Sequence, residues 1–242
     1  MQPSLIERYR GALLGLACGD AVGTSVEFQP RGSFPPLTNM VGGGPFHLKP
    51  GQWTDDTSMA LCLAESLLAK NGFDAADQMD RYLDWWQHGH LSSTGECFDI
   101  GMTVSDALAR YKETGQPFAG SSDPHTAGNG SLMRLVPVVL YYFPNRERVR
   151  TFAAKSSRTT HAAPEAVECC LLFADLICEA HPSRICSTQQ WHHSLNQKSP
   201  PSPEAISSPN LKAIFKAPDT ALPHSKRPYG ASITQTLLKQ PS

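Results

Sequence analysis

Residues 53–74 read WTDDTSMALCLAESLLAKNGFD, and this stretch decides the fold class. Apolar residues recur at helical spacing from Met59 to Leu67, and the pattern stops at Gly72. This spacing predicts an amphipathic helix that ends on a glycine. Asp74 follows at once, in a position suited to capping the next helix. The stretch therefore predicts two successive helices joined by a short turn.

Helical patterns of the same kind fill most of the first 181 residues. Besides the two just described, we expect helices over 5–17 (ending at Gly19), 99–114 (ending at Gly115), 131–143 and 164–180. Pro137 is expected to kink the 131–143 helix or to delay its start. Alternating runs rich in β-branched residues, which would indicate strands, are absent. We predict an all-α fold, a single helical domain with its functional groups on the connections between helices.

The composition changes near His181. Up to that residue the chain holds 14 Lys and Arg against 20 Asp and Glu, and afterwards 7 against 2. The last 61 residues also hold 9 of the 20 prolines. A proline-rich polar segment cannot bury enough apolar surface to offset its ordering entropy. We therefore expect a helical domain over 1–181 that is incomplete at its C-terminal end, followed by a basic, poorly ordered or frameshifted tail over 182–242.

Charge and cysteine usage exclude several classes of protein. A net charge of −1 gives no electrostatic case for binding nucleic acid or an anionic membrane surface. No run of about 18 apolar residues occurs, and Met1–Arg10 lacks an apolar leader. Seven cysteines, an odd number placed mostly in apolar stretches, indicate reduced thiols. We expect a cytoplasmic protein without nucleic-acid or membrane partners.

The acid pair that opens the first quoted helix has two interpretations of equal weight. Thr54, Asp55 and Asp56 are residue types that cap helices and interact favourably with the helix dipole. Adjacent carboxylates also repel each other unless a cation or a proton lies between them. A hydroxyl and two carboxylates form a hard oxygen cluster suited to Mg²⁺. Without sulfur or imidazole ligands nearby, zinc is disfavoured.

Three other connections carry polar residues that have ordinary interpretations as well. Residues 19–27 bring two acids and two glycines together, as a pocket or as a solvated loop. The glycine-rich segment 128–131 precedes an expected helix N-terminus, where phosphate can bind, and Arg134 one turn later fits a surface ion pair. His161, taken alone, is more often structural than catalytic.

Taken in this order, the segments resemble the ADP-ribosylglycohydrolase family, to which the dinitrogenase reductase-activating glycohydrolase belongs. The resemblance covers about residues 6–181. It is carried by RGALLGLACGDAVGTSVE at 10–27, WTDDTSM at 53–59, GNGSLMR at 128–134 with Pro137, and the pair Thr160-His161.

The resemblance implies an all-α domain with a pair of Mg²⁺ ions, which releases ADP-ribose from a modified protein side chain or small acceptor. It implies these roles: Thr54, Asp55 and Asp56 as metal ligands, Glu27 as a glutamate near the metals, Gly128, Asn129, Gly130 and Ser131 as the loop that cradles ADP-ribose, and His161 as a histidine facing the ligand. Cleavage at the anomeric carbon develops oxocarbenium character and needs a delivered water. Asp55 or Asp56 would take the proton, so Asp56→Asn should abolish hydrolysis and leave the fold intact.

One element of the family pattern is missing. Members carry a second acid cluster near the C-terminus, of the form Gly-Asp-(Asp/Thr)-Asp-Thr, whereas the only acids after Glu179 are Glu204 and Asp219. A frameshift near His181 is the first explanation and a genuine short variant the second. We expect weak Mg²⁺ binding, uncovered apolar faces on the 131–143 and 164–180 helices, and little or no hydrolase activity. A hydrolase, a non-catalytic ADP-ribose binder and a structural, crystallin-like protein remain as alternatives.

Overall fold

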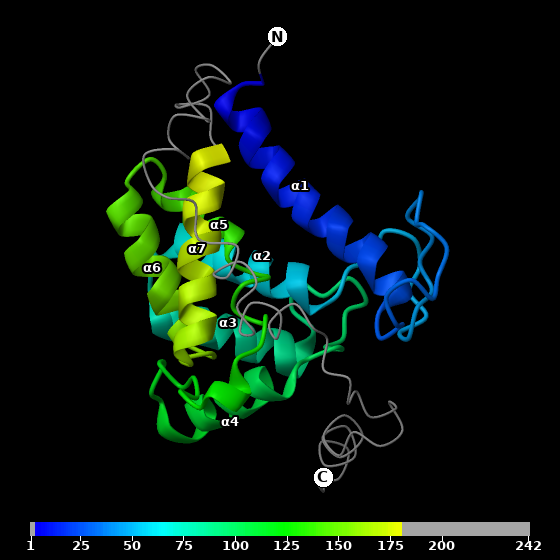
Figure 1. Ribbon diagram of the computed structural model, residues 1–242. Coiled ribbons are helices and arrows are strands. Elements are labelled where there is room, and N and C mark those ends of the chain that lie inside the picture. Colours follow the sequence, from blue (N-terminus) through cyan, green and yellow to red (C-terminus); the bar gives the residue numbers. More distant parts are fainter. Residues whose placement is uncertain (1–2, 181–242) are drawn as a thin grey trace, which may run out of the picture.

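The computed structural model describes residues 3–180, and this part of the chain is helical (Figure 1). Its elements are α1 (Leu5–Gly23), the 3₁₀ helix η1 (Thr24–Val26), α2 (Asp55–Ala69), α3 (Ala75–His88), α4 (Met102–Thr114), the 3₁₀ helix η2 (Pro124–Thr126), α5 (Val136–Tyr142), α6 (Arg146–Arg158) and α7 (Pro164–Ala180). Residues 3–180 contain no strand, only the isolated bridges Gly43–Leu48 and Ser121–His161. The predicted all-α fold is confirmed, and the predicted tail over 182–242 lies outside the described residues.

Helix α2 occupies the centre of the bundle (Figure 1) and packs against α1, α3 and α5. Helices α6 and α7 lie side by side on one flank, and α1 crosses the opposite flank. Every core-facing turn of α2 contributes to one apolar cluster, which includes Met59, Cys62, Leu63 and Leu67 from α2, Met79, Tyr82 and Trp85 from α3, and Val138 and Val139 from α5. The central position of α2 brings its N-terminal acids among several other elements. None of the described helices is long and apolar enough to cross a membrane.

Several helix ends follow the sequence signals. The Asp74 carboxylate accepts hydrogen bonds from the N–H groups of Ala76 and Asp77, at 3.0 Å each, and so caps α3. Helices α3 and α4 end on Gly89 and Gly115, both in the left-handed conformation that glycine adopts at low cost. The predicted cap at Asp74, the stop at Gly115 and the start of α7 at Pro164 are confirmed, whereas α2 ends at Ala69 and not at the predicted Gly72.

Other helix ends differ from the predictions, for tertiary or steric reasons. Helix α1 continues through Gly19 to Gly23, because its last turn contacts α2 and stays helical. Helix α4 starts at Met102, since Asp99 has a φ of 60° and cannot belong to a helix. Helix α5 starts only at Val136, with Pro137 in its first turn, which confirms the delayed start expected from that proline.

The expectation of uncovered apolar faces is right for one helix and wrong for the other. In α7, Leu172 and Leu176 are 45% and 55% exposed. In α5, by contrast, nearly every residue is buried, because α2, α6 and α7 all pack around it. The described helices are therefore sufficient to enclose α5.

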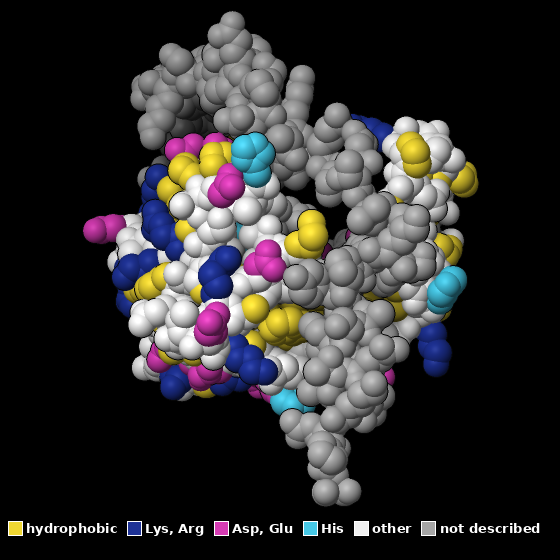
Figure 2. All heavy atoms as spheres, turned by 90° about the horizontal axis from the view of Figure 1, so that it is seen from below, with side chains coloured by type: hydrophobic (Ala, Val, Ile, Leu, Met, Phe, Trp, Pro, Cys, Tyr) yellow, Lys and Arg dark blue, Asp and Glu magenta, His cyan; other side chains and the backbone are white. Residues whose placement is uncertain are grey.

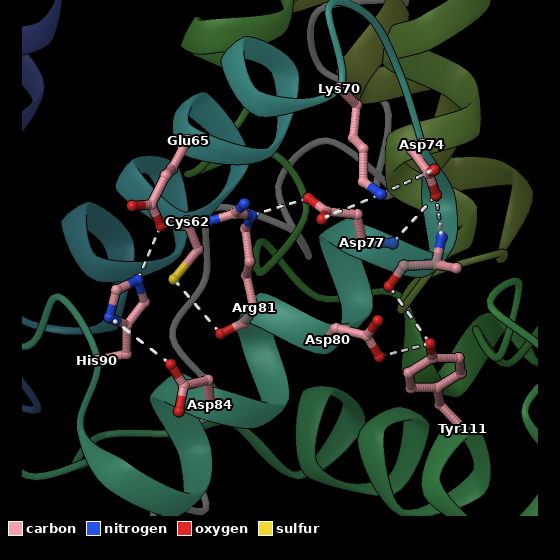
Figure 3. A network of polar contacts seen from close by, with 11 residues as sticks. Cys62, Glu65, Lys70, Asp74, Asp77, Asp80, Arg81, Asp84, His90 and Tyr111 are labelled. Carbon is pink, nitrogen blue, oxygen red and sulfur yellow. Dashed lines mark hydrogen bonds and ion pairs between the residues drawn. The ribbon is translucent and has the colours of Figure 1, made fainter.

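A surface network of ion pairs joins α2 to α3 (Figure 3). Arg81 on α3 contacts both Glu65 on α2 and Asp77 on its own helix. His90 lies between Glu65 and Asp84, with contacts of 2.8 and 3.7 Å. Such partly exposed pairs each contribute little, but together they restrict how α2 can rotate on α3. Elsewhere, Figure 2 shows basic and acidic side chains interspersed on one face of the described part.

The two left-handed glycines allow a matched stability test. A side chain at Gly89 would overlap the backbone of Gly95, whereas one at Gly115 would meet nothing within 4 Å. We expect Gly115→Ala to lower the free energy of unfolding by about 1–2 kcal/mol, the cost of a left-handed alanine. Gly89→Ala should cost at least about 1 kcal/mol more because the Gly95 segment must move. Urea denaturation of both variants measures the difference, and equal losses would contradict the close approach of Gly95.

Candidate active site

Asp20, in the last turn of α1, caps the N-terminus of α2. Thr54 occupies the N-cap position of α2, yet its own side chain makes no capping bond. Instead the Asp20 carboxylate accepts the backbone N–H groups of Thr54 and Thr57, at 3.1 Å each, and their hydroxyls at 2.8 and 2.6 Å. The capping function is thus supplied by α1. Asp55 and Asp56 are not needed for it, which leaves their carboxylates available for other chemistry.

Four acids from three segments gather at this end of α2: Asp55 and Asp56 themselves, Glu27 after η1, and Asp99 before α4. Glu27 and Asp99 share a hydrogen bond. Burial, reinforced by the charges of Asp99 and Asp56, raises the pKa of Asp55 well above its usual value. Burial and the charge of Asp20 raise the pKa of Asp56 to about 6. Burial and the charge of Asp56 raise the pKa of Glu27 to about 7.

Among the described residues, none provides this cluster with a balancing positive charge. Every charged neighbour that perturbs the pKa values of Glu27, Asp55 and Asp56 is itself an acid. The donors are all carboxylate and hydroxyl oxygens, which suit Mg²⁺. The Thr54 hydroxyl donates its proton to Asp20 and so keeps lone pairs for a cation. Within residues 3–180, however, no three His, Cys, Asp or Glu side chains converge into a metal site. The described residues therefore fit part of a coordination shell.

The second group of predicted residues surrounds His161. Gly130 lies against the imidazole, because a side chain there would come within 2.8 Å of Cε1 of His161. At Gly128 a side chain would lie 3.5 Å from Nε2 of the same ring. Glycine at both positions lets the 128–130 segment pass directly over the histidine. The hydroxyl of Ser131 turns inward and bonds the Ser157 hydroxyl at 2.8 Å.

Two expectations about this segment are wrong. Residues 130–134 form turns, so the glycine-rich loop does not lead directly into a helix N-terminus. Arg134 forms no surface ion pair; it is fully buried. Its guanidinium donates to the Gly130 carbonyl at 2.9 Å and lies 4.7 Å from the centre of the Tyr82 ring. The early turns before Pro137 point Arg134 into the core, which no local sequence pattern predicts.

His161 is 2% exposed and bonded to the protein through Nδ1, which lies 2.8 Å from the Thr160 hydroxyl. Burial, with a further contribution from the charge of Arg134, lowers the pKa of His161 to about 3. The imidazole is therefore neutral at physiological pH, so it can donate or accept a hydrogen bond but does not supply a positive charge.

The structure thus brings the predicted residues together in two groups. The acids lie at the start of α2, and the loop 128–131 with His161 lies beside α5. Arg134 connects the two, since it contacts Met59, one turn along α2 from Asp55. From the sequence, Asp20 is considered only as one of the two acids of segment 19–27, Asp99 only as the start of a helix, and Arg134 only as part of a surface ion pair. For Asp20 and Asp99 the available signal was an acid beside a helix end, which capping also explains.

Comparison with known proteins identifies the family. The family model described as ADP-ribosylglycohydrolase matches residues 1–230. The chain belongs to the ADP-ribosylglycohydrolase family. ADP-ribosylarginine hydrolase Tri1 of Serratia proteamaculans is 46% identical over 167 residues, 68% of this chain and 45% of the relative. ADP-ribosyl-[dinitrogen reductase] glycohydrolase of Rhodospirillum rubrum is 35% identical over 179 residues, 72% of this chain and 58% of the relative.

A solved structure titled "ADP-ribosylglycohydrolase-related protein complex" has the same fold, with a TM-score of 0.63 and 49% identity. The match covers 73% of this chain and 56% of that one. This ADP-ribosylglycohydrolase family member thus spans about half the length of the curated relatives it matches. At the level of the family, the relatives are hydrolases of glycosidic bonds to ADP-ribose.

The capping contact gives a stability prediction. Asp20→Asn keeps the size of the side chain but replaces one accepting oxygen with a donor, facing N–H and O–H groups that also donate. We expect a loss of about 2 kcal/mol in the free energy of unfolding, as for charge-assisted hydrogen bonds. Asp74→Asn is the matched control, because asparagine caps a helix about as well as aspartate. Urea denaturation that shows equal, small effects would contradict the role of Asp20.

The acid cluster gives a pH prediction for the protein in EDTA. Because the folded-state pKa of Glu27 is raised above that of the unfolded chain, folding takes up a proton there. The associated stability is complete below about pH 4.5 and is lost as pH rises through about 7. Glu27→Gln cannot ionise, so its stability relative to wild type should increase between pH 5 and pH 8. The exposed Glu113→Gln serves as control, and parallel pH profiles for Glu27→Gln and wild type would refute the shift.

Proposed function

We propose that this chain supplies the ADP-ribose cradle and the first acids of a Mg²⁺-dependent hydrolase. The reaction would release ADP-ribose from a modified protein side chain or a small acceptor in the cytoplasm. The observation that carries the proposal is the acid cluster at the start of α2, where Asp55 is buried and the other three acids are half-buried, and where residues 3–180 provide no balancing cation. An arginine-linked substrate is the first to test, since one relative is named an ADP-ribosylarginine hydrolase.

The acids have the properties that glycosidic cleavage requires. Departure of the acceptor leaves oxocarbenium character on the ribose, and nearby carboxylates stabilise that charge. Asp55 or Asp56 would accept the proton of the attacking water. Glu27, with a pKa of about 7, can hold or release a proton near neutral pH. Bound Mg²⁺ would supply Lewis-acid polarisation and would orient oxygen ligands near Thr54, Asp55 and Asp56.

The cradle would hold the ADP-ribose through backbone and neutral donors. Gly128, Asn129 and Gly130 offer a close backbone approach next to the imidazole of His161. The hydroxyl of Ser131 is engaged with Ser157, so Ser131 would contribute through its backbone. Such neutral donors can bind phosphate or ribose oxygens without a charged side chain.

We further propose that the 242-residue chain by itself binds Mg²⁺ weakly and has little or no hydrolase activity. Mg²⁺ gives up its waters reluctantly and needs well-placed carboxylates. The described acids form only part of a shell, and the sequence after residue 181 adds only Glu204 and Asp219. A non-catalytic ADP-ribose binder is the second candidate, because the loop over His161 is held through Arg134 and Ser157 and not through the acids at the start of α2.

Calorimetry of the full chain with ADP-ribose, with and without Mg²⁺, separates the candidates. Binding strengthened by Mg²⁺ supports the hydrolase site, and binding indifferent to Mg²⁺ supports the binder. If ADP-ribose does not bind in either condition, the result favours a structural protein. A parallel assay of ADP-ribose release from an ADP-ribosylated arginine peptide tests the activity directly. Rapid turnover by this chain would contradict the expected low activity.

Asp56→Asn tests the assignment of the acids. We expect the variant to lose the Mg²⁺-dependent part of ADP-ribose affinity and to lower any residual turnover by at least about 10²-fold, the usual contribution of a general base. Its fold should be retained, since Asp20 supplies the helix cap, and without Mg²⁺ at neutral pH its thermal unfolding temperature should not fall below that of wild type, because the raised pKa of Asp56 makes the ionised carboxylate destabilising. The exposed Asp106→Asn on α4 should change neither property. Retained Mg²⁺ dependence in Asp56→Asn would remove Asp56 from the site.

A further inference from the structure

Arg134 is a buried cation whose hydrogen bonds to described residues all end on neutral acceptors. Besides the Gly130 carbonyl, it donates to the Ser156 carbonyl at 3.2 Å and to the Thr160 hydroxyl at 2.7 Å. Burying a guanidinium without a carboxylate is costly, so its position must be held by these several neutral bonds. Arg134 thereby fixes two features at once: the carbonyl of the glycine loop and the hydroxyl of Thr160.

The Thr160 hydroxyl joins Arg134 to His161, and its bonding sets the direction of the hydrogen bonds. Arginine can only donate, so the Thr160 oxygen accepts from Arg134. Among the described residues, the one acceptor within reach of the Thr160 proton is Nδ1 of His161, at 2.8 Å. If Nδ1 carried the proton, it could donate to the second lone pair of the Thr160 oxygen, but the hydroxyl proton would then have no acceptor among the described residues. The network therefore assigns the imidazole proton to Nε2.

The protonated edge of the ring faces the glycine loop. A side chain at Gly130 would come within 3.2 Å of Nε2, and one at Gly128 within 3.5 Å. Nε2 makes no hydrogen bond to any residue in the range 3–180, although the ring is almost wholly buried. Nε2 is not among the fully enclosed unpaired atoms of the described residues, so this edge of the ring is accessible, and an N–H donor there is matched by water or a ligand. This donor lies beside the segment proposed to cradle ADP-ribose.

We propose that Thr160, held by Arg134, is a positioning residue that fixes His161 as the Nε2–H tautomer and aims this N–H at an oxygen of the ligand. The inference rests on the proposed function for the identity of that ligand, ADP-ribose. The opposite tautomer would present a lone pair, which repels phosphate oxygens because they carry no proton to donate. A protonated imidazole cannot substitute, because burial beside Arg134 keeps the ring neutral. Thr160 would therefore determine whether His161 attracts or repels the ligand.

The test compares Thr160→Val, which removes the hydroxyl and keeps the shape, with Thr160→Ser, which restores the hydroxyl. Imidazole ¹⁵N chemical shifts of the full chain, labelled on histidine, report the tautomer. The His161 signals are assigned from their loss in His161→Gln. We expect a single Nε2–H tautomer in wild type and Thr160→Ser, and a mixture or the Nδ1–H form in Thr160→Val. Thermal unfolding of each variant confirms that it is folded. A pure Nε2–H signal in Thr160→Val overturns the proposal.

Calorimetry with ADP-ribose gives the second readout. We expect Thr160→Val to bind about tenfold more weakly than wild type, the loss of roughly one hydrogen bond, and Thr160→Ser to bind within about twofold. An altered tautomer with unchanged ADP-ribose affinity also overturns the proposal, since His161 would then not face the ligand. Failure of wild type to bind ADP-ribose at all is a different result. It refutes the proposed function, while the ¹⁵N comparison still decides whether Thr160 controls the tautomer.

Discussion

The arrangement of the site depends on one contact, the carboxylate of Asp20 against the N-terminus of α2. It satisfies two backbone N–H groups and two hydroxyls of the first turn. Because the anion comes from α1, the contact both caps α2 and fixes the angle at which α1 meets it. Asp55 and Asp56, which lie between the two bonded threonines Thr54 and Thr57, then have no capping role. A local cap by Asp55 would have stabilised the helix equally well but would have engaged a carboxylate that the proposed hydrolysis uses.

Buried charge is distributed in an unusual way on either side of α2. Within residues 3–180, the acids collect at its N-terminus without a basic partner, and Arg134 lies one turn along it without an acidic partner. Pairing them would relieve both costs, yet Arg134 is bonded to neutral oxygens and stays separate. Each unpaired charge then has its own consequence. The acids, besides being partly removed from water, raise one another's pKa values and favour a cation, while Arg134 orders the loop and adds to the burial that keeps His161 neutral.

Local signals in the sequence predicted most of the fold, and nonlocal contacts account for the errors. Asp74, Gly89 and Gly115 act within their own helix ends, so their effect could be predicted from spacing alone. The end of α1 could not be predicted in this way, because it depends on the contact between Asp20 and Thr54 of α2. These two residues are 34 positions apart in the sequence. Asp99 looked like a helix start, but its positive φ places it in the acid cluster instead. The burial of Arg134 follows from the turns at 130–134. The apolar pattern of this segment is equally compatible with a helix, so the sequence alone did not predict the turns.

The raised pKa values connect the stability of the fold with the occupancy of the site. Without a cation, the acids at the start of α2 oppose folding increasingly as pH rises through about 6 and 7. A cation that binds the ionised acids reverses this cost, so its binding free energy contributes to folding. Residues 3–180 provide only some of the ligands that a cation would need, which limits the binding free energy that can contribute to folding. His161 and its loop carry no such cost, since they are neutral and already formed. The ligand cradle can therefore persist under conditions in which the acid cluster is protonated and a metal is absent.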